Sequence, residues 1–268
     1  METSEAGKKS GRLALPDCIR GITLISMILY HACWDAVYIV GADWPWYLSR
    51  ASYIWQQSIC WTFIFLSGFC VPFSKRLLKR GLTVFGAGAL VMLVTNLLLP
   101  EDRVVFGVLT LIGSCMLMMI PIRKITEDGG NTAALFAVSI VLFILCKDIN
   151  AGEIGTGMLH RILPVIPKWT VTVPSGLYRN LFTAYLGFPP ANFYSTDYFS
   201  ILPWCFLYLS GYAFHLILRD AGMMDSPAFR TDIRPLSFLG RHSLMIYLLH
   251  QPVLYLYVLL YLYAAKAG

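Results

Sequence analysis

The chain has 268 residues, of which 57% are hydrophobic and only 13% are charged, and its formal net charge is +6. Soluble domains carry about 25% charged residues, so this chain has too few charges to cover the surface of a soluble protein. Aromatic residues make up 14% of the chain, which suits the aromatic belts at membrane interfaces. The composition therefore excludes an ordinary soluble protein and predicts an all-α integral membrane protein, a bundle of about seven transmembrane helices.

Seven apolar stretches are candidates for crossing a bilayer, which takes about 20 residues per helix. In chain order, the predicted spans are Leu15–Val40, Ala51–Phe73, Gly81–Pro100, Val104–Ile122, Thr132–Cys146, Phe199–Leu218 and Leu244–Ala265. The fifth is the shortest, so its helix either extends beyond these ends or crosses the bilayer only in part.

Positive charges concentrate in alternate loops of this arrangement. One side would hold Lys8, Lys9, Arg12, Lys75, Arg76, Lys79, Arg80, Arg123, Lys124, Arg219, Arg230, Arg234 and Arg241. The opposite short loops hold only Arg50 and Arg103. By the positive-inside rule, the N-terminus is predicted to be cytoplasmic and the C-terminus extracytoplasmic.

The same topology divides the chain into three parts. Residues 1–13 form a cytoplasmic tail, residues 14–268 form a single transmembrane domain, and residues 147–198 form a long extracytoplasmic loop within it. Residues 177–186 of that loop predict a short helix on or in the outer interface. Long ordered loops are often functional, so this loop could roof a cavity.

Costly ionisable residues line one face of the first predicted span. At about 100° per residue, Arg20 and His31 lie within about 20° of the same face, and Asp17 lies close to it. Asp35 lies one turn beyond His31 on that face. A histidine with a carboxylate one turn away suits an oriented general base. The alternative is structural, in which Asp17 and Arg20 pair and His31 bonds to a neighbouring helix.

The last predicted span supplies a second polar group. Ser243 and His250 are seven residues apart and share a helix face. His250 and Gln251 lie inside an apolar run, where an unpaired polar group is costly. A catalytic role for His250 and simple hydrogen bonding between helices both remain open.

The entrance to the sixth predicted span is also polar. Asp197 either caps that helix or faces an outer ligand. In the fourth span, Gly107 and Gly113 mark a close helix contact or a place for a ligand, and the helix contact is the simpler interpretation.

Six motifs in this order resemble a known family. They are Asp17–Gly21, Met27–His31, Phe63–Gly68, Phe106–Leu109, Asp197–Trp204 and Gly240–Pro252. Together they resemble the bacterial relatives of the heparan-α-glucosaminide N-acetyltransferase catalytic domain, over residues 13–255. The spacing of Arg20 and His31 also resembles the wider transmembrane acyltransferase group that modifies cell-surface polysaccharides, in which this histidine is thought to be essential.

The chain departs from the lysosomal branch of that family in two ways. The lysosomal enzyme has more helices and a luminal domain. Its active histidine lies near the outer end of the first helix, where this sequence has Ala42 and Asp43. His31 matches the polysaccharide-modifying pattern instead.

The resemblance implies transfer of an acyl group, usually acetyl, from cytoplasmic acyl-CoA to a sugar or glycan on the outer side of a bacterial cytoplasmic membrane. The expected catalytic residues are His31, Asp35 and His250. The expected contacts of acyl-CoA are Asp17, Arg20, Lys75, Arg76, Arg241 and Ser243. Asp197 and Trp204 are the expected contacts of the acceptor.

Acyl-CoA, the acceptor and membrane lipid are the expected partners, with no metal and no nucleic acid, and dimerisation of the chain is left open. Two other functions are compatible with the same residues. A transporter or flippase would use the polar face as a path for protons or substrate. A non-catalytic membrane partner of an acyltransferase would use it for packing alone.

Overall fold

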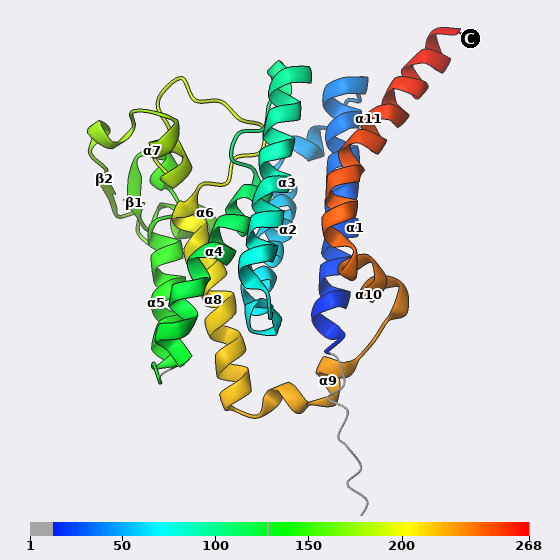
Figure 1. Ribbon diagram of the computed structural model, residues 1–268. Coiled ribbons are helices and arrows are strands. Elements are labelled where there is room, and N and C mark those ends of the chain that lie inside the picture. Colours follow the sequence, from blue (N-terminus) through cyan, green and yellow to red (C-terminus); the bar gives the residue numbers. More distant parts are fainter. Residues whose placement is uncertain (1–12, 128, 268) are drawn as a thin grey trace, which may run out of the picture. The chain divides into compact units, whose positions relative to one another are not determined.

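A computed structural model describes residues 13–127 and 129–267 of the chain (Figure 1). The helices are α1 (Leu15–Asp35), α2 (Arg50–Phe69), α3 (Leu77–Leu98), α4 (Val108–Glu127), α5 (Thr132–Leu145), α6 (Gly157–Ile162), α7 (Leu181–Leu186), α8 (Ile201–Asp220), α9 (Pro227–Arg230), α10 (Arg234–Arg241) and α11 (Ser243–Ala267). The strands are β1 (Glu153–Gly155) and β2 (Thr170–Thr172). A π-helical turn, Ala36–Val40, continues α1, and short 3₁₀ turns lie at Pro45–Leu48, Val71–Phe73, Pro100–Asp102, Ile149–Ala151, Ser175–Leu177 and Met223–Asp225.

Within the described residues, six helices are long and apolar enough to cross a membrane, and the chain is therefore an integral membrane protein. They are Leu15–Val40, Leu77–Leu98, Val108–Thr126, Thr132–Ala151, Ile201–Asp220 and Ser243–Ala265. The short fifth span is thus extended at its C-terminal end, as one of the two alternatives predicts.

The predicted second span, Ala51–Phe73, corresponds to α2, which is a helix but not one of these six. Gln56 and Gln57 lie in its first half and lower its hydropathy. The count of apolar spans in the described chain is therefore six, one fewer than the sequence predicts.

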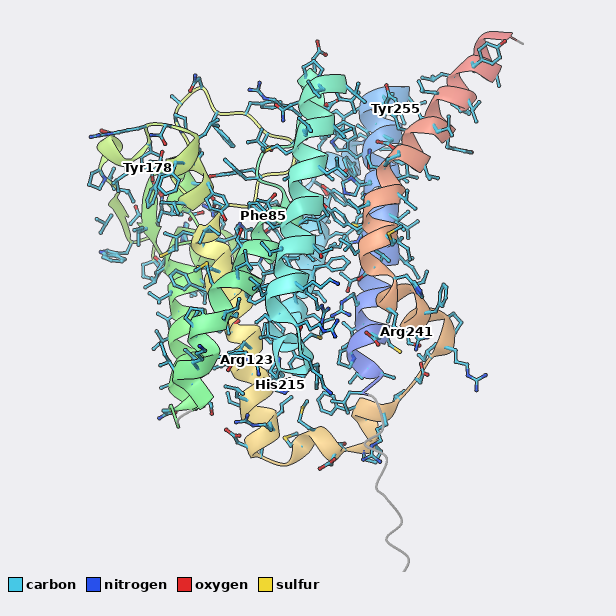
Figure 2. The ribbon with its side chains drawn as sticks, in the orientation of Figure 1. Phe85, Arg123, Tyr178, His215, Arg241 and Tyr255 are labelled. Carbon is cyan, nitrogen blue, oxygen red and sulfur yellow. The ribbon has the colours of Figure 1, made fainter. Side chains whose placement is uncertain are left out.

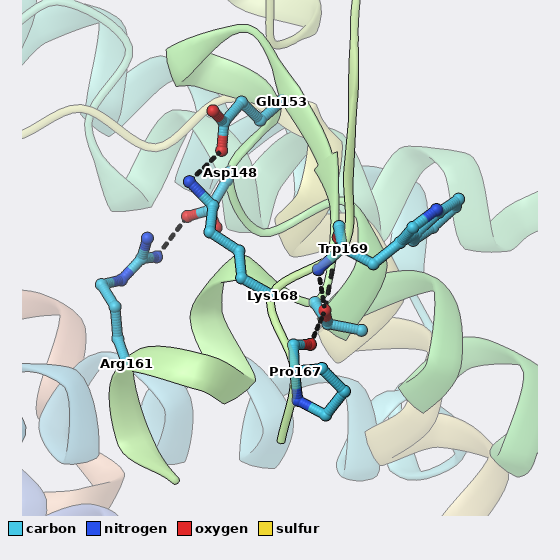
Figure 3. Close-up of polar contacts among 7 residues, drawn as sticks. Asp148, Glu153, Arg161, Pro167, Lys168 and Trp169 are labelled. Atoms are coloured by element: carbon cyan, nitrogen blue, oxygen red, sulfur yellow. Dashed lines mark hydrogen bonds and ion pairs between the residues drawn. The ribbon is translucent and has the colours of Figure 1, made fainter. Parts of the chain in front are cut away.

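No long irregular loop is evident in the described residues 147–198, because the segment is folded. Strands β1 and β2 pair antiparallel, with Ile154 opposite Val171. Ion pairs join Arg161 to Asp148 and Lys168 to Glu153 (Figure 3). The predicted helix over residues 177–186 is present as a 3₁₀ turn followed by the shorter α7.

The chain forms two compact units. Unit 1 comprises residues 1–59 and 221–268, and unit 2 comprises residues 60–220, so the two halves of α2 belong to different units. Lys8, Lys9 and Arg12, and all of the predicted cytoplasmic tail except Leu13, lie outside the described residues.

In unit 1, α1 packs closely against α10 and also contacts α11. A Cβ atom at Gly21 would collide with the backbone carbonyl of Leu236, and one at Gly240 would collide with that of Asp17. Glycine is therefore required at both positions, because the two helix backbones touch there. The backbone N–H of Ile233 also donates to Cys18 Sγ at 3.4 Å, which fixes the entry to α10.

In unit 2, α3 packs on α4, and α8 packs on α5 and α4. Gly113 lies against the backbone of Phe85, which supports the packing interpretation for this glycine. Gly68 of α2 and Gly211 of α8 likewise allow those two helices to touch.

Candidate functional site

Two histidines meet in unit 1. His31 lies in the C-terminal half of α1, and His250 lies one-third of the way along α11. Their ring centroids are 4.9 Å apart, and the rings are tilted by 61°. His250 is only 9% exposed, whereas His31 is half-buried. The structure therefore brings together the two histidines that the sequence singles out on different spans.

His250 is held by its own helix. Its Nδ1 lies within hydrogen-bonding distance of the Tyr247 carbonyl oxygen, and because a carbonyl only accepts, Nδ1 carries the proton and donates it. In the neutral ring, Nε2 then has a free lone pair. This Nε2 is buried and has no hydrogen-bond partner among the described residues. A ring fixed in this way presents a proton acceptor at a defined position.

Asp35 and Gln251 form the next contact between the same helices. Gln251 Nε2 donates to Asp35 Oδ1 at 3.0 Å, and Asp35 is only 1% exposed. Burying a carboxylate is costly unless it accepts hydrogen bonds, so this contact helps to keep Asp35 in place. The sequence predicts that Asp35 orients His31, whereas this hydrogen bond connects Asp35 to the residue after His250.

Gln251 is not among the predicted site residues, although its position beside His250 in an apolar run is a visible signal. Its Oε1 is buried and accepts no hydrogen bond from the described residues. The contact to Asp35 crosses from α11 to α1, and a single sequence gives no register between two helices. The sequence therefore shows that Gln251 is an unusual residue for this span, but it does not predict that Asp35 is its partner.

Aromatic side chains cover one side of His31 in unit 1. The Tyr30 ring lies 5.2 Å from both the Tyr47 and the Trp55 rings, centroid to centroid. Trp55 Nε1 donates to Ser26 Oγ at 2.7 Å, which anchors the start of α2 on α1. Burial raises the pKa of Tyr47, so its hydroxyl keeps its proton and donates to the Tyr30 carbonyl. These contacts form an aromatic cluster around Tyr30, whose ring lies 6.3 Å from the His31 ring, centroid to centroid.

The ionic pair of the polar face lies near the start of α1. Arg20 Nη1 is 3.2 Å from Asp17 Oδ1, and both side chains are largely buried. The same face thus carries an ion pair near one end of α1 and the histidine pair near the other. Arg241 is exposed at the end of α10, and Ser243 begins α11.

The family model described as heparan-alpha-glucosaminide N-acetyltransferase, catalytic, matches residues 12–252 of this chain. The chain belongs to this family. No curated protein and no solved structure gave a significant match. The family consists of membrane acetyltransferases that use acetyl-CoA, so the predicted resemblance is confirmed and an acetyltransferase activity is implied.

Unit 2 of this N-acetyltransferase domain holds the remaining predicted site residues. Asp197 Oδ2 accepts a hydrogen bond from the backbone of Val108 at 3.4 Å, at the N-terminus of α4. Asp197 therefore contacts the N-terminus of α4. This contact unites two motifs of the family, Phe106–Leu109 and Asp197–Trp204. Phe199 also donates its backbone N–H to the Phe106 carbonyl at 2.8 Å, which reinforces the junction.

Trp204 is buried in unit 2 instead of lining an open surface. Its ring packs against Phe143 and Phe199, and Lys147 Nζ lies 4.3 Å from the ring centroid. Lys75 and Arg76, which precede α3, are exposed. In the described parts of the chain, no group of three or more His, Cys, Asp and Glu side chains is placed to hold a metal ion.

Proposed function

We propose that this chain transfers an acetyl group from cytoplasmic acetyl-CoA to the amino group of a glucosaminide on the opposite side of the membrane. Membership of the N-acetyltransferase family supports the donor and the type of reaction. The observation that carries the assignment to a site is the His31–His250 pair in unit 1, with the Asp35–Gln251 hydrogen bond beside it.

In this proposal His31 is the general base, because it is the more accessible of the two histidines. Its ring takes a proton from the acceptor nitrogen as that nitrogen bonds to the thioester carbonyl carbon. The carbon–sulfur bond then breaks, and the imidazolium returns the proton to the sulfur of the leaving coenzyme A. A route in which His31 briefly carries the acetyl group uses the same side chain.

His250 and Asp35 support the charge that forms on His31. The Nε2 lone pair of His250 can accept a hydrogen bond from the protonated His31 ring, since the ring centroids are 4.9 Å apart. The Asp35 carboxylate, fixed by Gln251, lies one turn further along α1 and favours a nearby positive charge. Gln251 therefore joins the proposed site as a positioning residue.

For the donor, the proposal keeps the cations predicted at the cytoplasmic side. In unit 1, Arg20 with its partner Asp17, Arg241 and Ser243 are proposed to meet the coenzyme. In unit 2, Lys75 and Arg76 are proposed as separate contacts with its phosphates, because both are exposed cations. For the acceptor, Asp197 of unit 2 remains the proposed contact, whereas Trp204 is buried and is not proposed to touch the acceptor.

The proposed topology counts α2 as a seventh span, with a cytoplasmic N-terminus, an outer C-terminus and a single domain over residues 14–268. The proposed location is a bacterial cytoplasmic membrane. Contacts within unit 2 agree with this arrangement. Arg123 at the end of α4 bonds to the Ser74 carbonyl, and both are predicted to be cytoplasmic. Thr196 donates to the Arg103 carbonyl, and both are predicted to be outside.

The test is a transfer assay on the purified full chain in lipid nanodiscs. Acetyl-CoA and a glucosamine-terminated oligosaccharide should yield free coenzyme A and an acetylated sugar in equal amounts. The product should disappear when the acceptor amine is already acetylated. Release of no coenzyme A, together with uptake of the sugar by sealed vesicles, would indicate the transporter alternative instead.

A further inference from the structure

A second polar cluster lies in unit 2, among residues that the proposed reaction does not use. It consists of Ser74 in the connection between α2 and α3, Arg123 in the last turns of α4, and His215 in α8. Figure 2 labels Arg123 and His215. Ser74 is 6% exposed and His215 is 4% exposed. Two buried polar residues and the half-buried Arg123 thus come from three different parts of the chain.

Two polar atoms of this cluster lack hydrogen-bond partners in the described parts of the chain. They are Ser74 Oγ and His215 Nδ1, and both are buried. A buried polar atom without a partner is costly, so native proteins rarely leave two of them near one another without a use. Unpartnered groups of this kind indicate where a polar ligand belongs.

Contacts with the turn that ends in Ser74 bring the three residues near one another. The His215 ring packs at 4.8 Å from the Phe73 ring and at 4.9 Å from the Phe69 ring, centroid to centroid. Ser74 directly follows Phe73, and Arg123 Nη1 donates to the Ser74 carbonyl at 3.3 Å. The histidine and the guanidinium therefore both adjoin the turn that ends in Ser74.

A hydrogen bond between α4 and α8 holds this arrangement. Thr126 Oγ1 and Tyr212 Oη are 2.7 Å apart, and each lies three residues from a member of the cluster. The His215 ring is further held by its packing against the Phe69 and Phe73 rings. Its Nδ1 has no hydrogen-bond partner among the described residues and is left for a ligand.

The charge around the cluster is positive. Lys75 and Arg76 follow Ser74 directly and are exposed. Arg219, one turn after His215, is paired with Asp220. A ligand for this site must therefore be an anion with several acceptor oxygens.

We propose that Ser74, Arg123 and His215 bind a phosphate group, with Lys75 and Arg76 at the entrance. The serine hydroxyl and the guanidinium donate to phosphate oxygens. His215 Nδ1 donates to a third oxygen when the ring is protonated, or accepts from a phosphate O–H when it is neutral. Each of the two unpartnered atoms gains a hydrogen bond in this way.

The phosphate has two chemical sources. One is the phosphomonoester of coenzyme A, and in that case the inference rests on the proposed function. The other is the headgroup of an anionic phospholipid, which would make the site a lipid site independent of the reaction. Both sources offer the same oxygens, so they are separated by experiment.

The first arm compares coenzyme A with dephospho-coenzyme A, which lacks only the phosphomonoester. Binding is measured by calorimetry on the full chain in phosphatidylcholine nanodiscs, where no anionic lipid competes. We expect the wild type to bind coenzyme A about 10-fold more tightly than the dephospho form. Ser74→Ala and His215→Gln should lose most of that preference. Glutamine keeps a polar side chain of similar length but has no counterpart of Nδ1.

The matched control is Lys124→Gln, which removes one exposed cation next to Arg123 and should keep the preference. His31→Ala should keep it as well, because His31 acts only in the transfer step. A chain that shows the preference but makes no product would therefore refute the proposed function and leave the phosphate site intact.

The second arm uses nanodiscs that contain equal amounts of phosphatidylglycerol and phosphatidylcholine. Native mass spectrometry then counts the lipid molecules that stay bound after release. A lipid site predicts that phosphatidylglycerol is retained by the wild type and by Lys124→Gln, and is lost from Ser74→Ala and His215→Gln. If the wild type neither prefers coenzyme A over its dephospho form nor retains phosphatidylglycerol, the proposal is wrong. That outcome needs no variant, so it holds even if a variant fails to fold.

Discussion

Each unit contains a buried histidine, His250 in unit 1 and His215 in unit 2. One ring nitrogen of each has no hydrogen-bond partner among the described residues, but the surroundings of the two histidines differ. In unit 1, His250 adjoins His31, and the carboxylate of Asp35, bonded to Gln251, lies one turn along α1 from His31. In unit 2, His215 and Arg123 both adjoin the turn that ends in Ser74, where the nearby charges are cationic. A carboxylate favours protonation and proton transfer, whereas cations favour the binding of an anion. The neighbours of a buried histidine therefore separate a proposed reaction site from a proposed binding site.

The largest expected effect is on the rate of the chemical step, which the proposal assigns to the histidine pair of unit 1. His31→Ala should reduce kcat for acetyl transfer by about 10²–10⁴-fold, because a general base contributes about that factor. The variant should still bind coenzyme A. Steady-state kinetics and calorimetry on one preparation measure both quantities. His160→Gln, which changes a histidine in the folded segment of residues 147–198, is the matched control and should retain wild-type kcat.

The second prediction compares the effect on kcat of changing Asp35, which bonds to Gln251, with the effect of changing His31. Asp35→Asn should lower kcat about 10-fold, less than His31→Ala does, because the substitution removes the charge but keeps an acceptor oxygen. In a double-mutant cycle with Gln251→Leu, thermal unfolding should give a coupling energy of about 1–3 kcal/mol. A coupling near zero would show that Asp35 and Gln251 act independently.

The third prediction concerns the close contact between α1 and α10 in unit 1. Gly240→Ala should destabilise the protein by about 1–3 kcal/mol, because the added Cβ would collide with the Asp17 carbonyl. Gly86→Ala in α3 is the control, since a Cβ added there would meet nothing within 4 Å. Thermal unfolding in detergent should separate the two variants. Equal melting temperatures would argue against a close contact between α1 and α10.

The smallest expected effect is on the affinity for coenzyme A when exposed cations are neutralised. Arg241→Gln should weaken binding of coenzyme A a few-fold, and raising the salt concentration should reduce the difference between variant and wild type, since exposed charges are screened. Lys75→Gln combined with Arg76→Gln should behave in the same way in unit 2. Titrations at low and high salt measure both effects. An affinity that is independent of salt in the wild type would contradict these contacts.

Much of this fold follows from the sequence because membrane spans depend on local hydropathy. Except for Ala51–Phe73, every predicted span lies on a helix that is long and apolar enough to cross a membrane, with ends shifted by a few residues in cases such as Phe199–Leu218 and α8. The first span is longer than its α-helix, because a π-helical turn continues it. The segment of residues 147–198 is harder to predict, because its short strands and ion pairs depend on contacts within the segment and not on periodicity.

The candidate sites are less predictable than the spans. His31, Asp35 and His250 can be found from sequence because a polar residue in an apolar run is conspicuous. Gln251 and His215 lie in equally apolar runs, but their partners come from other parts of the chain. The Ser74–Arg123–His215 cluster needs the register of α4 against α8, which is set by side-chain packing and by the Thr126–Tyr212 hydrogen bond. Sequence reasoning from a single chain cannot supply that register.

The most direct test of the central claim is kcat for His31→Gln and His250→Gln, measured with donor binding on the same preparations. Glutamine keeps a hydrogen bond but cannot take up a proton, so it separates positioning from proton transfer. We predict that His31→Gln binds coenzyme A like the wild type and loses about 10²-fold or more in kcat, whereas His250→Gln loses less. Wild-type turnover by His31→Gln together with an inactive His250→Gln would contradict the account and assign the base to α11.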